Sequence, residues 1–477
     1  MVTALRWSGL RSIIKLSASL VVPIILARLL SPNEFGLIAM AAVFTNITLL
    51  ITDLGTGDAL IQHQKADNVL ESSIFWLNIA IATSVAGVLV IASTTIGEFY
   101  GKPVIASIVQ YLSLVLLIQS TTLVQLALLK KHRNFKIITL AELGSQLIGA
   151  LVAVSLALND FGIWSLVYYS IVKAFVYTVI VWVLSDWRPR FCFNTTKVRT
   201  IVSFSLNLTV VKFLNYVERN SDKLIIGYWQ GESAVGLYSR AYSSFNQVIK
   251  VMNGFYNPVF YSILSKEQKK RHYIKQILLV SYQSLVYIFL PISIVLMIYS
   301  SELVLIVFGP KWLEMAPILE LLGAVCIVKP IHKLNVEVFK SVNKVESLRT
   351  IWLIFTPIFV VSFLIGNNVY GSVGVATAYL VVSSLLAFVT TSMVMHYLDI
   401  KFIEIIHSFL NVILRGIAVF ILAIVLNNST IFSILNGYPE LIVGLKIFSI
   451  LAIYFILQLF FPVKAQQKII ELVRRRV

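Results

Sequence analysis

The sequence predicts an all-α polytopic membrane protein of about 14 transmembrane helices. Of the 477 residues, 58% are hydrophobic and only 13% are charged, unlike the composition of soluble globular domains. Runs of about 20 apolar residues, the length that crosses a hydrocarbon core of roughly 30 Å, recur along the whole chain. Short phrases of the first half also return, in order, in the second half. We therefore expect two parallel six-helix repeats around a central cavity, followed by two accessory helices.

The predicted spans follow one another at short intervals. Those of the first repeat are residues 11–30, 37–57, 73–97, 104–129, 137–158 and 161–184. Those of the second repeat are residues 201–228, 234–263, 276–299, 313–339, 348–366 and 370–395, and the accessory spans are residues 410–427 and 441–461. The seventh, eighth and tenth spans carry internal charge and have the weakest hydropathy. The matching domain prediction is an N-lobe (1–190), a C-lobe (191–400) and an accessory region with a basic tail (401–477).

Glycines mark the internal repeat. Counterparts in the two halves are Gly36 with Gly236, Tyr100-Gly101-Lys102 with Phe308-Gly309-Pro310, Lys130 with Lys340, and Phe161-Gly162 with Tyr370-Gly371. The separations of 200, 208, 210 and 209 residues are almost constant. Because the copied segments are apolar, the repeated unit is a bundle of membrane helices, which is the usual build of secondary transporters.

Basic residues predict the orientation. With the amino terminus inside, the cytoplasmic loops and tails hold twenty-six Lys and Arg residues, whereas the opposite loops hold only Lys102 and Lys311. The positive-inside rule therefore places both termini in the cytoplasm. Most of the net charge of +17 lies in these cytoplasmic loops and tails, so anionic lipid is the expected partner rather than nucleic acid. The first span lacks a small-residue cleavage site, and we expect it to be retained as a helix.

The sequence contains no recognisable catalytic or metal-binding set. The segment Gly97-Glu-Phe-Tyr-Gly101-Lys102 has three residues between its glycines and no Ser or Thr after the lysine, so it predicts a turn rather than a phosphate loop. No histidine has a partner at metal-ligand spacing. Cys192 falls in a cytoplasmic loop and Cys326 within a span, which disfavours a disulfide. We expect no enzymatic activity, no catalytic residue, no metal and no cofactor.

Charged residues within the spans are the main functional signal. Each such charge costs about 2.5–3.5 kcal/mol unless it faces water or a partner. Arg11, Lys15 and Arg349, at cytoplasmic span ends, are counted with the twenty-six cytoplasmic basic residues. The spans then hold eleven further basic residues: Arg28, Lys173, Lys212, Arg219, Lys223, Arg240, Lys250, Lys329, Lys333, Arg415 and Lys446. Apart from Glu314 at the outer end of the tenth span, they hold only six acids: Asp53, Glu142, Glu218, Asp222, Glu320 and Glu337. The charged side chains within the spans must therefore contact water, pair with opposite charges, or both.

Helical periodicity places several of these charges on shared faces. In the seventh span one polar stripe within about 80° of arc contains Ser205, Thr209, Lys212, Tyr216, Arg219 and Lys223. In the eighth span a stripe within about 100° contains Arg240, Ser243, Gln247, Lys250, Gly254 and Asn257. Asn46 and Asp53 share a face of the second span. Polar faces on consecutive helices predict one wall of a water-filled cavity.

These faces give the predicted site. The substrate-binding cations are Lys212, Arg219, Lys223, Arg240 and Lys250, and the polar cavity residues are Tyr216, Gln247, Asn257 and Asn46. Asp53 is a candidate proton or sodium site. The alternative interpretation is structural ion pairing or snorkelling, which we favour for the isolated or near-terminal Arg28, Arg415 and Lys446. For the five site cations, Glu218 and Asp222 are too few to neutralise the charge.

Several phrases carry a family resemblance. They are Leu29-Leu-Ser-Pro-Asn-Glu-Phe-Gly-Leu37, Asp53-Leu-Gly-Thr-Gly-Asp-Ala-Leu-Ile-Gln62, Phe161-Gly-Ile-Trp164, Trp187-Arg-Pro-Arg190, Gly236-Leu-Tyr-Ser-Arg-Ala241 and Phe308-Gly-Pro-Lys-Trp312. Together they resemble the lipopolysaccharide and exopolysaccharide flippases, the polysaccharide-transporter branch of the multidrug/oligosaccharidyl-lipid/polysaccharide superfamily. The resemblance covers residues 1 to about 400. It implies two six-helix lobes whose cavity cations meet anionic groups of the substrate, and Arg240 is the motif-matched position.

The function implied by this resemblance is transfer of a lipid-linked oligosaccharide across the bacterial inner membrane. We expect an undecaprenyl-pyrophosphate-linked repeat unit of O-antigen, capsule or exopolysaccharide to move from the inner to the outer leaflet by alternating access. Its pyrophosphate would lie against Arg219, Arg240 and Lys250. The expected partners are this anionic substrate, membrane lipids and glycan polymerase machinery, with no nucleic acid. The sequence leaves the glycan and any coupling ion open.

Two other functions stay open. A drug or cation exporter of the same superfamily is disfavoured because a cationic cavity repels cationic drugs. A membrane glycan polymerase would normally need a sizeable outer loop, and the longest outer connections, 300–313 and 427–440, are about fifteen residues.

Overall fold

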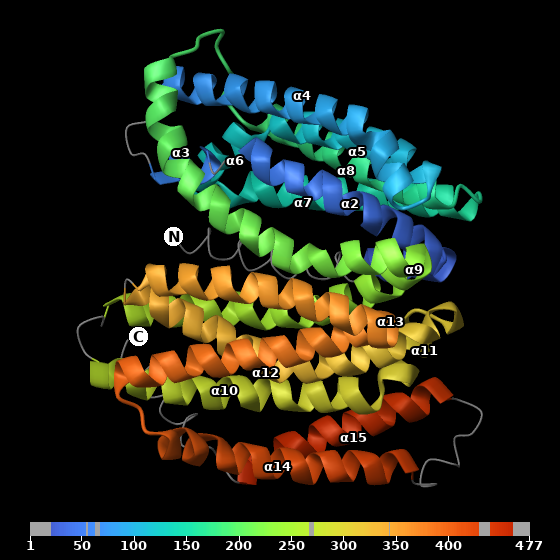
Figure 1. The fold of residues 1–477 in the computed structure, drawn as a ribbon, viewed down its shortest axis with the longest axis vertical. Coiled ribbons are helices and arrows are strands. Elements are labelled where there is room, and N and C mark those ends of the chain that lie inside the picture. Colours follow the sequence, from blue (N-terminus) through green and yellow to red (C-terminus); the bar gives the residue numbers. More distant parts are fainter. Residues whose placement is uncertain are drawn as a thin grey trace. The chain divides into compact units, whose positions relative to one another are not determined.

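The computed structural model describes residues 21–53, 56–62, 67–266, 271–342, 344–428 and 439–460 (Figure 1). Every regular element within these residues is a helix. The chain forms two compact units, Met1–Arg240 and Ala241–Val477, which we describe separately. The predicted lobe boundary near residue 190 stays a prediction.

The first unit contains a helix over residues 21–29 and then seven complete helices. They are α2 (Pro32–Asp53), α3 (Thr56–Gln62), α4 (Asn68–Phe99), α5 (Pro103–Ser120), α6 (Leu123–Lys131), α7 (Phe135–Leu158) and α8 (Ile163–Leu184). The long helix α9 (Thr195–Lys266) follows and crosses the boundary between the units. It is kinked at Gly231, where φ is 82° and ψ is −171°, between the seventh and eighth predicted spans.

The second unit contains the end of α9 and the remaining helices. They are α10 (Arg271–Ile298), α11 (Ser300–Val307), the short 3-10 helix η1 (Pro310–Met315), α12 (Ala316–Ser341), α13 (Val345–Leu398), α14 (Phe402–Asn428) and α15 (Pro439–Phe460). Helix α13 is kinked at Tyr370 and Gly371, the first two residues of the twelfth predicted span. The two accessory helices pack on α10, where the Tyr454 hydroxyl donates to the carbonyl of Tyr287 at 2.9 Å.

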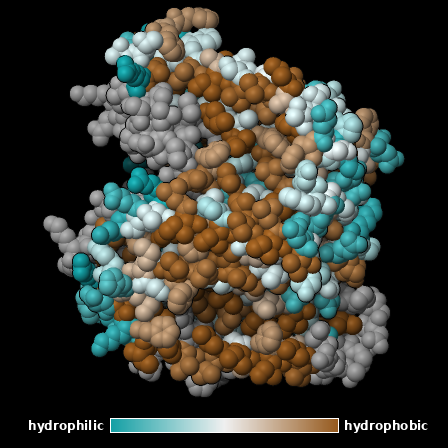
Figure 2. Space-filling view, in the orientation of Figure 1, coloured by the Kyte–Doolittle hydropathy of each residue, from teal (hydrophilic) through white to brown (hydrophobic). Residues whose placement is uncertain are grey.

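The helices have the length and surface of membrane spans. Within the described residues, seven helices are long and apolar enough to cross a bilayer. Large apolar side chains are strongly exposed along them, for example Ile91 (80%), Leu151 (71%) and Phe388 (65%). Hydrophobic side chains cover the middle stretches of the helices, and hydrophilic ones gather toward the helix ends (Figure 2). The chain is an all-α multi-pass membrane protein, and the exact count of fourteen spans stays a prediction.

Matched glycines of the two repeats adopt matching backbone conformations. Gly162 has φ 52° and ψ −126°, and its counterpart Gly371 has φ 59° and ψ −140°. Side chains disfavour this left-handed region, so glycine is the natural residue at both turns. A second matched pair, Gly101 and Gly309, also has positive φ, at 63° and 93°. The same turns thus recur at corresponding points of the two repeats.

The prediction of one continuous helix is wrong for the fourth span. The structure breaks residues 104–129 between α5 and α6. The hydroxyls of Ser120, Thr121 and Thr122 each donate to the carbonyl three residues earlier, at 2.7–2.8 Å, which competes with the helical bonding pattern. Trp182 of α8 then donates its indole N–H to the freed carbonyl of Thr121 at 3.2 Å. The break is a consequence of three consecutive hydroxyl residues, which hydropathy does not detect.

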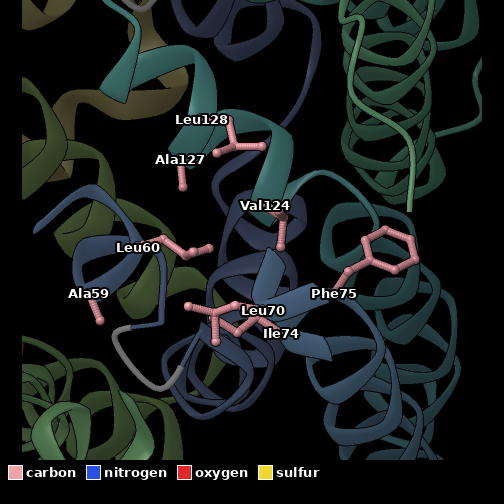
Figure 3. Close-up of a cluster of buried hydrophobic side chains, with 8 residues drawn as sticks. All are labelled: Ala59, Leu60, Leu70, Ile74, Phe75, Val124, Ala127 and Leu128. Carbon is pink, nitrogen blue, oxygen red and sulfur yellow. The ribbon is translucent and has the colours of Figure 1, made fainter. Parts of the chain in front are cut away.

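An apolar cluster joins α3, α4 and α6 in the first unit. Figure 3 shows side chains from the three helices meeting around Leu60, Ile74 and Val124, all at most 1% exposed. Trp187 packs against this cluster and donates its indole N–H to Asn68 Oδ1 at 3.1 Å. The cluster therefore fixes the short helices α3 and α6 at the start of α4.

Candidate functional site

The charged stripe on the first part of α9 separates acids from cations. Glu218 and Asp222 are buried, with 8% and 1% exposure, whereas Arg219 is exposed. Arg219 forms no ion pair with any described residue. Lys223 is half-buried, and its Nζ donates to Asn220 Oδ1 at 3.2 Å. The two acids thus face the protein interior, and Arg219 keeps its charge on the open face of the helix.

Tyr216 connects this stripe to α2. Its hydroxyl donates to the backbone carbonyl of Val43, and its ring is half-buried. Asn46, one turn beyond Val43, is exposed. The predicted polar residues Tyr216 and Asn46 therefore lie on two helices that contact each other within the first unit.

Arg240 is held against the start of α2. Its guanidinium lies 4.3 Å from the centroid of the Phe35 ring, which is a stacking distance. Ser31 caps this end of α2: its N–H and its hydroxyl donate to Glu34 Oε2 at 2.6 and 2.9 Å. Arg240, the position matched by the family motif, is therefore placed by the residue that precedes Gly36.

An ion pair accompanies this contact between α2 and α9. Lys102 Nζ donates to Glu232 Oε1 at 2.8 Å. Partial burial acts to raise the pKa of Glu232, but the hydrogen bond from Lys102, a backbone hydrogen bond and the charge of Lys102 together outweigh it, so the pKa lies below its ordinary value. Glu232 follows the kink at Gly231, so the ion pair fixes the point where α9 bends.

The remaining predicted residues are placed as follows. Gln247 is half-buried and Lys250 is exposed, and both belong to the second unit. The side chains of Lys212, Asn257 and Asp53 lie outside the part of the chain that the structure describes. The structure thus brings Tyr216, Arg219, Lys223 and Arg240 onto one unit, and the assignment of all these residues to a substrate site stays a prediction.

The first unit contains a cavity of about 710 Å³. It lies among the helix at residues 21–29 and helices α2, α5, α6, α7 and α8, and Asn46 is the predicted residue that lines it. Its other polar lining includes Glu142, Gln146, Tyr169 and Lys173. Gln146 Nε2 donates to the Tyr169 hydroxyl at 2.8 Å, and Lys173 Nζ lies 5.5 Å from the Tyr169 ring centroid.

Glu142 and Lys173 are charged residues of the predicted spans that lie outside the predicted site. The sequence signal that could have located the cavity was this acid and this base, which lie in two consecutive apolar spans. Both residues line the cavity because α7 packs closely against α8. Gly149 permits this packing, since a Cβ there would lie only 3.3 Å from the Lys173 Cβ. The cavity could therefore not be located from periodicity alone.

Comparison with known proteins decides the family. The family profile described as polysaccharide biosynthesis protein matches residues 25–317, more than half of the chain. The chain belongs to this family. The resemblance inferred from the sequence phrases is thereby confirmed.

Two relatives and one solved structure are also similar to this chain. The succinoglycan biosynthesis transport protein ExoT of Rhizobium meliloti is 31% identical over 305 residues, which cover 63% of this chain and 60% of ExoT. The lipopolysaccharide biosynthesis protein WzxC of Escherichia coli is 24% identical over 391 residues, covering 80% of this chain and 78% of WzxC. The lipid II flippase MurJ, in an inward closed conformation, has a TM-score of 0.74 at 12% identity, covering 95% of this chain and 99% of MurJ. This last likeness shows a shared fold.

Proposed function

We propose that this polysaccharide biosynthesis protein is a flippase that moves a lipid-linked anionic oligosaccharide from the inner to the outer leaflet of the bacterial cytoplasmic membrane. Membership of the family is the observation that carries the proposal. ExoT is named a transport protein of succinoglycan biosynthesis, and WzxC belongs to lipopolysaccharide biosynthesis. The substrate we infer is an undecaprenyl-pyrophosphate-linked repeat unit of O-antigen, capsule or exopolysaccharide.

The charge pattern of α9 supports an anionic substrate. Arg219 is exposed on a helix whose acids, Glu218 and Asp222, are buried. A cation within a membrane span costs about 2.5–3.5 kcal/mol unless it faces water or a counter-charge, so its retention needs a reason. Binding of the pyrophosphate by Arg219, Arg240 and Lys250 supplies that reason. The same cations would repel the substrates of an exporter of cationic drugs.

The membrane potential provides a driving force for the proposed direction. With the cytoplasm negative, each negative charge that moves outward gains about 2.3 kcal/mol per 100 mV. A diphosphate that is not fully neutralised by the cavity cations would therefore move outward downhill during alternating access. Asp53 stays the candidate residue for coupling to protons or sodium.

The cavity of the first unit suits the polar part of such a substrate. Its volume of about 710 Å³ lies within the range of roughly 300–1,000 Å³ that is usual for small-molecule sites. Asn46 and Gln146 offer amide donors and acceptors, and Tyr169 offers an aromatic ring. We assign this cavity to the first sugars of the oligosaccharide.

Orientation and partners complete the proposal. Twenty-six basic residues in the predicted cytoplasmic loops and tails favour cytoplasmic termini and residence in the inner membrane. We expect the chain to work beside glycan polymerase machinery and to catalyse no covalent step.

The test is deletion of the gene in its own bacterium, followed by complementation. We expect the deletion strain to lose surface glycan and to accumulate lipid-linked repeat units on the cytoplasmic side, and the intact gene to restore export. A glycan polymerase would give a different result, because single repeat units would still reach the outer surface. That outcome would overturn the proposal.

A further inference from the structure

Lys329 of α12 lies in an aromatic cage within the second unit. Its Nζ is 5.1 Å from the ring centroid of Tyr379, 5.2 Å from that of Phe245 and 5.3 Å from that of Tyr242. The three rings are at most 7% exposed, whereas Lys329 itself is only half-buried. Two rings come from α9 and one from α13, so three helices fix the position of a single ammonium group.

The contacts of Lys329 orient its charge without neutralising it. Nζ donates to Asn246 Oδ1 at 3.4 Å and to the Tyr379 hydroxyl. Among the described residues no carboxylate pairs with it, and aromatic faces and neutral oxygens leave a net positive charge. An ammonium group has three N–H donors, and two of them are used here. The third donor is available for another acceptor.

A second cation lies one helical turn from this cage. Lys250 follows Asn246 by four residues on α9, so their Cβ atoms are about 5–6 Å apart on the same helix face. Lys250 is exposed, and Gln247 lies between them on the chain. Asn246 therefore connects the caged ammonium to the face that carries Lys250.

We propose that Lys329 is an anion-binding residue that, together with Lys250, contacts the diphosphate group of the substrate. The inference rests on the proposed flippase function and adds a residue from α12 to the predicted cations. Two cations, Lys329 bound to Asn246 and Lys250 one turn from Asn246 on the same face of α9, match the charge of a diphosphate better than that of a single carboxylate. The cage serves to hold the ammonium in place, which lowers the entropy lost when the anion binds.

The test uses the purified full-length chain in lipid-free detergent micelles. Inorganic pyrophosphate is titrated while the thermal unfolding midpoint is measured, because a ligand that binds the folded state raises the midpoint. We expect pyrophosphate to raise the midpoint of the unaltered chain and Lys329→Gln to weaken its apparent Kd at least tenfold. The matched control is Lys344→Gln, since Lys344 also lies over a tyrosine ring, 5.9 Å from the centroid of Tyr397, but at the N-terminal start of α13.

A second measurement needs no variant. Acetic anhydride acetylates free amines, and mass spectrometry gives the extent of modification at each lysine. We expect pyrophosphate to slow acetylation of Lys329 several-fold and to leave Lys344 unchanged. Equal acetylation of Lys329 with and without pyrophosphate would overturn the inference, as would an unchanged Kd in Lys329→Gln.

Detergent micelles that contain phosphatidylglycerol distinguish the two possible sources of the phosphate group, a lipid headgroup and a free diphosphate. If phosphatidylglycerol protects Lys329 and pyrophosphate does not, the residue binds a lipid headgroup and the diphosphate assignment is wrong. A chain that exports glycan normally in cells but shows no pyrophosphate effect contradicts this inference alone. A chain that exports no glycan contradicts the proposed function instead.

Discussion

Gly36 of α2 and Gly236 of α9 bring the backbones of the two helices into direct contact. A Cβ at Gly36 would lie 1.7 Å from the carbonyl oxygen of Glu232, and one at Gly236 would lie 1.9 Å from that of Pro32. The two glycines occupy matching positions in the internal repeat. The repeated phrase therefore marks a place where corresponding segments of the two repeats meet.

Alanine at either glycine should destabilise the protein. Because the added methyl group would collide with backbone atoms that cannot rotate away, α2 and α9 must separate, and we expect a loss of about 1–3 kcal/mol or more in the free energy of unfolding. Gly87→Ala is the control, since nothing lies within 4 Å of a Cβ there. Chemical denaturation of the purified variants measures the difference. Equal stability of Gly36→Ala and Gly87→Ala would contradict the close contact.

The ion pair between Lys102 and Glu232 should make stability depend on pH. The folded-state pKa of Glu232 is lowered, so its contribution is fully present above the ordinary value of 4.5 and is lost as pH falls through the lowered value. Because the Lys102 side chain is 43% exposed, we expect less than about 1 kcal/mol. The free energies of unfolding of the unaltered chain and Glu232→Gln should differ at pH 7 and converge near pH 3. A difference that is the same at both pH values would show that the ion pair contributes nothing.

Much of the fold could be predicted because hydropathy and chain turns are local properties. The kink at Gly231 falls between two predicted spans, as the polar and glycine residues there indicate, and the kink at Gly371 falls at the start of the twelfth predicted span. The break at Thr121 could not be predicted from hydropathy, because it arises from hydroxyls that bond their own backbone.

The site was harder to predict than the fold. Helical periodicity places Tyr216, Arg219 and Lys223 on one face of the seventh span, and in the structure Arg219 is exposed whereas Tyr216 and Lys223 are half-buried. The stacking of Arg240 on Phe35 and the cavity beside Tyr169 depend on which helices pack together, and a single sequence does not determine that packing.

Membrane orientation can be tested by thiol labelling. In a Cys192→Ser background, Lys311→Cys should react with an impermeant maleimide in whole cells, and Asn134→Cys should not, because the positive-inside rule places residue 134 in the cytoplasm. Both positions are exposed in the structure, so burial cannot explain a lack of labelling. Permeabilised cells provide the control, in which both cysteines should react. Labelling of Asn134→Cys in intact cells would reverse the orientation.

Paired substitutions on α9 separate substrate binding from structural pairing. Arg219→Gln should abolish surface glycan while leaving the protein level intact, because the pyrophosphate loses a charged contact. If Arg219 only balanced Asp222, the combination Arg219→Gln with Asp222→Asn would restore export, since no charge would be left uncompensated. We expect no restoration, because Arg219 is exposed and Asp222 is buried. Quantitative immunodetection of surface glycan distinguishes the two results.

Transfer of substrate between leaflets in proteoliposomes tests the central proposal most directly. The purified chain is reconstituted with an undecaprenyl-pyrophosphate-linked oligosaccharide that carries a fluorophore on its sugar, and a membrane-impermeant quencher reports the outer leaflet. We expect transfer from the inner leaflet that is faster than in protein-free liposomes, and little transfer with Arg219→Gln combined with Arg240→Gln. Transfer by the unaltered chain no faster than in protein-free liposomes would contradict the assignment as a flippase.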